Sequence, residues 1–138
     1  MIKINTFNNK RAELHFERKM NVYEVKFFKS IINIMKSDGF KSNYLIYDES
    51  KFLSIFDQDI DDMKEILNYE FYEDVDDNFN YNDFLRIINN VQDNFFMLID
   101  NNEYIRSHLY SIIYPKDSNN IILNVDKSIF EYLKTKYQ

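Results

Sequence analysis

Residues 21–39 read NVYEVKFFKSIINIMKSDG and carry the clearest secondary-structure signal in the chain. Asn21 followed by Glu24 three positions later is the pattern of an N-terminal capping box. Apolar residues then recur at the three- and four-residue spacing of one helix face; they are Val22, Val25, Phe28, Ile32 and Met35. The run stops at Ser37-Asp38-Gly39, where glycine favours a helix end. The stretch therefore predicts an amphipathic helix.

The segments on either side of this helix have the alternation of strands. Residues 2–18 alternate apolar and polar side chains around Asn8-Asn9, which can supply a turn, so we expect a hairpin there. After the helix, residues 43–47 form a short strand candidate. The fold is therefore expected to begin with two strands, a helix and a third strand.

The second half of the chain mixes helical and strand patterns. A helical stretch is expected over 50–56, restarting near Asp57 or Asp59 and running to about Tyr69, followed by a polar loop over 70–82. Helical spacing predicts another helix over 83–98. Residues 104–114 and 120–125 flank a turn-like segment and predict a second hairpin, and Asp126 can cap a final helix. This order predicts an α+β fold in which antiparallel hairpins pack with about four helices.

Composition bounds the class of protein. With 138 residues, 45% of them apolar and 17% aromatic, the chain is expected to fold as one domain over residues 1–138. It has no cysteine, which excludes disulfides, thiolate zinc sites and a cysteine nucleophile. The first nineteen residues carry many charged side chains and lack the apolar segment of a signal peptide. No uninterrupted apolar stretch is long enough to span a membrane, so we expect a cytoplasmic protein. Abundant Asn, Ile and Lys indicate an AT-rich genome.

Charge is segregated along the chain. Between Asp57 and Asp83 there are eleven acidic residues and one basic residue, against six acidic and ten basic residues in the first fifty-six. On a helix, the carboxylates at the start of this stretch would lie close together along one flank. The carboxylates later in the stretch would extend that row of negative charge. Such a face can imitate a nucleic-acid backbone, although a solvated acidic surface is the simpler interpretation. The candidate partner-binding residues are Asp57, Asp59, Asp61, Asp62, Glu65, Glu70, Glu73, Asp74, Asp76 and Asp77.

Two motifs carry alternative interpretations. Residues 74–85 resemble the second half of an EF-hand, as in degenerate light-chain-like proteins, but Asp77 stands where the turn glycine belongs and Asp83 where the bidentate Glu belongs. Asp38, Glu49 and Lys51 have the order of the D…ExK pattern of metal-dependent nucleases, but Asp38 lies in a helix-ending turn. We therefore expect no metal site and no cofactor.

The remaining candidates for chemistry are few. His15 and His108 are both on expected strands and lack metal-ligand spacing. Gly39 is the only glycine, which excludes nucleophile elbows and phosphate-cradling loops. We therefore predict no catalytic residues and no enzymatic activity.

Partners follow from the charge. The basic residues of the first fifty-six positions are diluted by acids, so direct nucleic-acid binding is not expected, and pairing of a basic end with an acidic face in a homodimer is left open. We expect a non-enzymatic protein that binds a basic, nucleic-acid-handling protein. A phage- or mobile-element-encoded inhibitor of a host nuclease or defence system, similar in action to an anti-CRISPR protein, is its most concrete form. A toxin-neutralising immunity protein would have the same features.

Overall fold

The computed structural model describes residues 2–6, 13–66, 80–100 and 103–138. In this part of the chain the helices are α1 (Val22–Ser37), α2 (Glu49–Leu53), α3 (Tyr81–Asp93) and α4 (Lys127–Tyr137), with two 3-10 helices, η1 (Ser54–Asp57) and η2 (Asp61–Ile66). The strands are β1 (Ile2–Thr6), β2 (Glu13–Phe16), β3 (Tyr44–Tyr47), β4 (Phe96–Asp100), β5 (Glu103–Ser107), β6 (Tyr110–Ile113) and β7 (Ile121–Val125). The predicted α+β class, with antiparallel hairpins and four α-helices, is confirmed.

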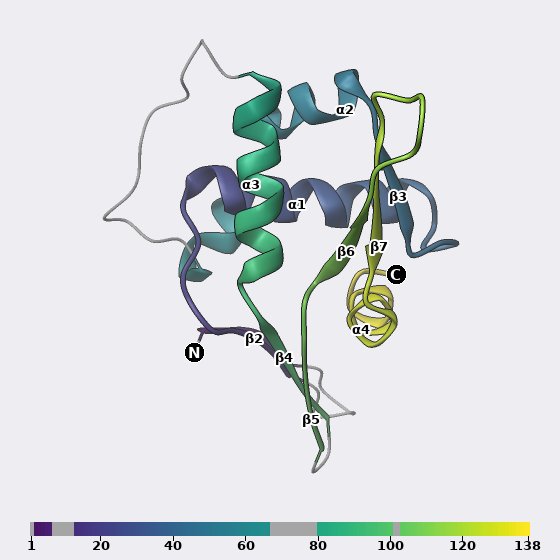
Figure 1. Ribbon diagram of the computed structural model, residues 1–138. Helices are drawn as coiled ribbons and strands as arrows, with labels where there is room; N and C mark the ends of the chain where they lie inside the picture. The colour runs from purple at the N-terminus through teal and green to yellow at the C-terminus, as the bar shows by residue number, and fades with distance from the viewer. Residues whose placement is uncertain (1, 7–12, 67–79, 101–102) are drawn as a thin grey trace.

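The strands form two antiparallel sheets. One has the order β1-β2-β4-β5 and the other the order β3-β7-β6. The predicted hairpins β1–β2 and β6–β7 are confirmed, although the turn at Asn8-Asn9 lies outside the described residues. Figure 1 shows β5 continuing into β6, so that the two sheets are joined by this short link.

Helix α1 lies at the centre of the molecule. Its capping box is present: the Asn21 side chain accepts from the Glu24 N–H, and the Glu24 carboxylate accepts from the Asn21 N–H. Gly39 follows with a φ of +70°, a value that glycine adopts without strain. The predicted apolar stripe is buried, and so are Phe27 and Ile31 beside it. Helix α1 therefore packs against neighbours over more than one face.

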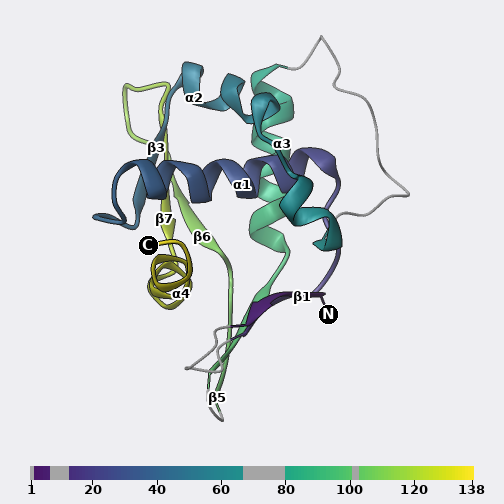
Figure 2. The same cartoon turned by 180° about the vertical axis from the view of Figure 1, so that it is seen from behind.

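Aromatic side chains join the other elements to α1. The Phe27 ring contacts Tyr47 of β3 and Phe84 of α3, with centroids 5.4 and 5.9 Å away, and these two rings also contact each other at 5.7 Å. Phe84 in turn stacks on Phe52 of α2 at 4.9 Å. Figures 1 and 2 show α3 crossing α1 and α2 lying on the same side of α1 as the upper end of α3. One continuous hydrophobic cluster thus ties the helices to both sheets.

The prediction of a helix over residues 83–98 is wrong at both ends. Helix α3 begins at Tyr81 and ends at Asp93, and the last predicted residues form β4, a central strand of the four-stranded sheet. The buried Asn94 separates the two elements: its side chain accepts from the Arg18 N–H and donates to the Arg18 carbonyl. Pairing with β2 therefore overrides the helical spacing of this apolar run.

The expected single strand over residues 104–114 is also wrong. It is divided into β5 and β6, which belong to different sheets. At the break, the His108 Nδ1 lies 2.6 Å from the Gln92 carbonyl, and the Leu109 carbonyl accepts from the Asp126 N–H. Both contacts are with residues distant in sequence, which explains why strand periodicity did not reveal the break.

The helix expected to restart near Asp57 and run to Tyr69 is replaced by η1 and η2, which are separated by residues 58–60. Residues 67–69 and most of the expected loop over 70–82 lie outside the described residues. The final helix begins as predicted, because the Asp126 side chain accepts from the Ile129 N–H. No helix in the described ranges is both long and apolar enough to span a bilayer.

Candidate functional site

The described part of the acidic block lies on η1, η2 and the link between them. Asp57 ends η1, Asp59 lies in the link, and Asp61 and Asp62 begin η2. All four side chains are exposed. We call residues 57–62 the acidic turns.

The other six candidates fall outside the described side chains. Glu65 belongs to η2, but its side chain lies outside the description. The candidates Glu70, Glu73, Asp74, Asp76 and Asp77 lie outside the described residues. Four of the ten predicted partner-binding side chains are therefore available to build a site.

The acidic turns take their shape from local hydrogen bonds. Asp59 Oδ1 accepts from the Asp61 N–H at 3.0 Å, which closes an Asx turn. Gln58 lies in extended backbone, and its side-chain oxygen accepts from the Asn33 Nδ2 of α1 at 2.5 Å. Because this turn interrupts the helix, the predicted crowding of carboxylates along one helix flank does not occur.

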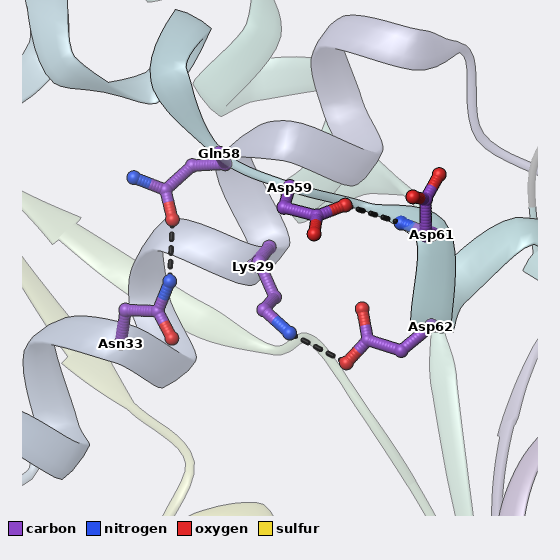
Figure 3. A network of polar contacts seen from close by, with 6 residues as sticks. All are labelled: Lys29, Asn33, Gln58, Asp59, Asp61 and Asp62. Atoms are coloured by element: carbon purple, nitrogen blue, oxygen red, sulfur yellow. Dashed lines mark hydrogen bonds and ion pairs between the residues drawn. The ribbon is translucent and has the colours of Figure 1, made fainter.

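Two lysines of α1 hold the acidic turns and the residue before them against the core, and Figure 3 shows one of them, Lys29. Lys29 Nζ lies 2.5 Å from Asp62 Oδ2, and the Lys29 side chain is only 16% exposed. One turn earlier, Lys26 Nζ donates to the Phe56 carbonyl at 2.9 Å. Figure 3 also shows the Asp61 carboxylate pointing away from Lys29. The charges that are segregated in sequence are therefore partly paired in space.

Further carboxylates lie upstream of the acidic turns. Asp48 caps α2, accepting from the Lys51 N–H and the Ser50 hydroxyl, and these donors lower the pKa of its carboxyl group. Glu49 follows it, and both side chains are exposed. Residues 48–59 thus carry four exposed carboxylates, those of Asp48, Glu49, Asp57 and Asp59, and one cation, Lys51.

A groove that the sequence did not reveal runs beside β3. Its volume is about 570 Å³, within the range of ligand clefts in proteins. It is lined by Tyr44, Leu45 and Ile46 of β3, by side chains of the C-terminal half of α1, and by Lys51, Ser54 and Gln58 of the segment over α2 to the acidic turns. No sequence signal pointed to it, because β3 reads Tyr-Leu-Ile-Tyr without polar alternation, and its exposed and buried faces are distinguished only in the structure.

The structure separates the residues of the alternative motifs. Asp38 and Lys51 line the β3 groove, but Glu49 lines a different cavity, so the D…ExK set is not assembled. Asp83, the expected last ligand of an EF-hand, accepts from the Asn80 N–H in the capping box of α3. That bond assigns the Asp83 carboxylate to the capping box whose N-cap is Asn80, and the two sheets have no counterpart in an EF-hand.

The histidines lie in different surroundings. His15 is on β2, opposite Met97 of β4, whereas His108 lies in the link after β5 with its ring 4.2 Å from that of Phe95. Within the described ranges, no group of three or more His, Cys, Asp or Glu residues is placed to hold a metal ion. The geometry is thus that of an acidic surface beside a groove.

Comparison of the chain with protein-family models, with curated proteins and with solved structures finds no match.

Proposed function

We propose that this protein is a non-enzymatic binding protein that places its acidic turns on a basic surface of another macromolecule. The observation that carries the proposal is the anchoring of these turns to α1. Lys26 and Lys29 hold the segment, while the carboxylates of Asp57, Asp59 and Asp61 remain exposed. An acidic segment held in place in the free protein loses little conformational entropy on binding.

The charge supports a basic partner, because a concentrated field of one sign steers an oppositely charged surface during encounter. Nucleic-acid-handling proteins present such surfaces. An inhibitor that is encoded by a phage or mobile element and covers a nuclease or defence protein is the concrete form of this proposal. An immunity protein that neutralises a nuclease toxin would use the same contact.

The experiment compares two double variants with the same change in net charge. Asp57→Lys with Asp59→Asn alters the acidic turns, and the Asn keeps the acceptor of the Asx turn. Glu103→Lys with Asp117→Asn is the charge-matched control outside the acidic turns, on β5 and in the loop between β6 and β7; Asp117 has a φ of +64°, which Asn tolerates. Each protein is used to capture partners from a lysate of the source organism, and association rates of the captured partner are measured across a salt series.

The wild type and the control should bind alike, with rates that fall as salt rises. The acidic-turn variant should associate at least about tenfold more slowly at low salt, because electrostatic steering is worth roughly ten- to thousandfold in rate. Equal binding by all three proteins, or rates that do not respond to salt, would overturn the proposal.

A further inference from the structure

Strand β3 has an unpaired edge. It pairs with β7 on one side and is the outer strand of its sheet in the described residues. The Val125 N–H donates to the Asn43 carbonyl at 2.8 Å, and antiparallel pairing alternates, so Leu45 and Tyr47 turn their backbone groups toward β7. The backbone groups of Tyr44 and Ile46 therefore point away from the sheet.

These outward groups are largely unused. The Tyr44 N–H donates to the Ser42 hydroxyl at 3.1 Å. In the described part of the chain, the Ile46 N–H and C=O and the Tyr44 C=O have no backbone partner. An edge with one free donor and two free acceptors is a template for another strand.

The surroundings of the edge favour an added peptide over a second folded copy. The groove beside β3 is bounded by α1 and by the segment that carries Lys51, Ser54 and Gln58. Figure 2 shows β3 and α2 meeting above the C-terminal half of α1. We therefore expect the groove to accommodate a single extended chain, whereas the neighbouring strands of a second sheet would meet the wall.

Charge indicates the chemistry of that peptide. The segment over residues 48–59 bounds the groove and carries four exposed carboxylates and one lysine, while the groove itself is lined by one acid, Asp38, and one base, Lys51. Acids therefore outnumber the lysine in these surroundings, which favours basic side chains. On the outer face of the sheet, Tyr44 and Ile46 are 53% and 49% exposed, which favours apolar side chains beside them. Successive residues of a strand face opposite sides, so one peptide with alternating basic and apolar residues satisfies both.

We propose that β3 is extended by a basic, extended segment of the partner, which binds by strand addition in the groove along Tyr44–Ile46. The inference rests on the proposed function, since it assigns a binding mode to the same basic partner. The acidic turns steer the partner, and the strand edge then fixes the register of the bound segment.

The test uses a synthetic, end-blocked hexapeptide of alternating lysine and valine as the probe, with amide hydrogen exchange read by NMR. In the free protein, the Ile46 amide should exchange quickly and the Leu45 amide slowly. At a probe concentration about ten times its Kd, exchange at Ile46 should slow about tenfold, while Leu45 should not change. A probe that binds without protecting Ile46 would overturn the proposal.

Two variants are designed to weaken strand addition at β3 in different ways. Ile46→Pro lacks the outward N–H, and proline is tolerated where that N–H faces solvent. Ile46→Lys keeps the N–H and places a like charge beside the basic probe, which covers the case in which the proline variant fails to fold. Ile113→Lys is the matched control, because Ile113 and Ile46 both lie opposite Ile122 on the same face of the sheet.

Both Ile46 variants should lose probe binding by tenfold or more, and Ile113→Lys should retain it. Equal protection of the Ile46 amide by a valine–glutamate peptide would contradict the preference for basic side chains. Protection that grows with protein concentration alone would assign the edge to a second copy. If the probe fails at Ile46 while the acidic-turn variant still loses its natural partner, strand addition is wrong and the proposed function stands.

Discussion

Lys29 Nζ and Asp62 Oδ2 lie 2.5 Å apart, joining the basic N-terminal half of the chain to its acidic block. The Lys29 side chain is 16% exposed and the Asp62 side chain 56% exposed, so the pair is at the margin of the solvent. It anchors η2 to α1, beside the hydrogen bond from Lys26 to the Phe56 carbonyl. Asp62 of the acidic block therefore serves the fold, while the Asp57 side chain remains exposed for contact.

A double-mutant cycle measures this anchor. Lys29→Ala and Asp62→Ala should show a coupling free energy of up to about 1 kcal/mol, because Asp62 is half exposed and solvent screens the pair. Coupling should fall in high salt. Arg86 and Asp83, a pair three residues apart on α3 whose side chains are 71% and 32% exposed, form the matched cycle and should couple by about 0.3 to 0.5 kcal/mol. Urea denaturation of the seven proteins, the wild type and three variants for each cycle, gives both values, and zero coupling for Lys29 and Asp62 would contradict the anchor.

Asn94→Ala should destabilise the fold by about 2 to 3 kcal/mol, because the Asn94 side chain is buried and both backbone groups of Arg18 lose a partner. Asn89→Ala on the exposed side of α3 is the control and should change stability by less than about 0.5 kcal/mol. The measurement is the free energy of unfolding in urea. Equal values for the two variants would show that Asn94 does not hold β4 to the end of β2.

Buried tyrosines should make the protein unfold in alkali. Burial raises the pKa of Tyr137 to about 12, and it also raises the pKa of Tyr47 and of Tyr110 above the ordinary value. A folded-state pKa above the unfolded value near 10 means that the native state keeps its proton longer. The stability from these groups is therefore complete below about pH 10 and is lost as pH rises through the folded values.

Tyr47→Phe isolates one of these groups. The Ser30 hydroxyl donates to the Phe27 carbonyl, so the Tyr47 hydroxyl donates to Ser30, and its removal leaves Ser30 with a partner. The variant should lose about 1 kcal/mol at pH 7 and show a weaker fall in stability above pH 10. Tyr104→Phe, on an exposed side chain, is the control. Urea titrations from pH 7 to 11.5 measure both, and parallel curves for all three proteins would contradict the role of burial.

Local signals made much of the fold predictable. The capping box at Asn21 and Glu24 and the cap at Asp126 each act within three residues, so sequence alone located the starts of α1 and α4. Strand β4 was missed because five apolar residues fit a helix or a strand equally well, and the choice depends on pairing with β2. The break after β5 depends in the same way on contacts with Gln92 and Asp126.

The features of the candidate site also divide into those that the sequence determined and those that the tertiary structure decided. Composition and charge order by themselves determined that the acids are concentrated after Asp57, because charge is a property of each residue. Tertiary structure decided that Lys29 neutralises Asp62, that an Asx turn at Asp59 replaces the expected helix, and that the edge of β3 opens onto a groove. These features arise where segments distant in sequence meet, and hydrophobic burial, which is not directional, brings such segments together without a local signal.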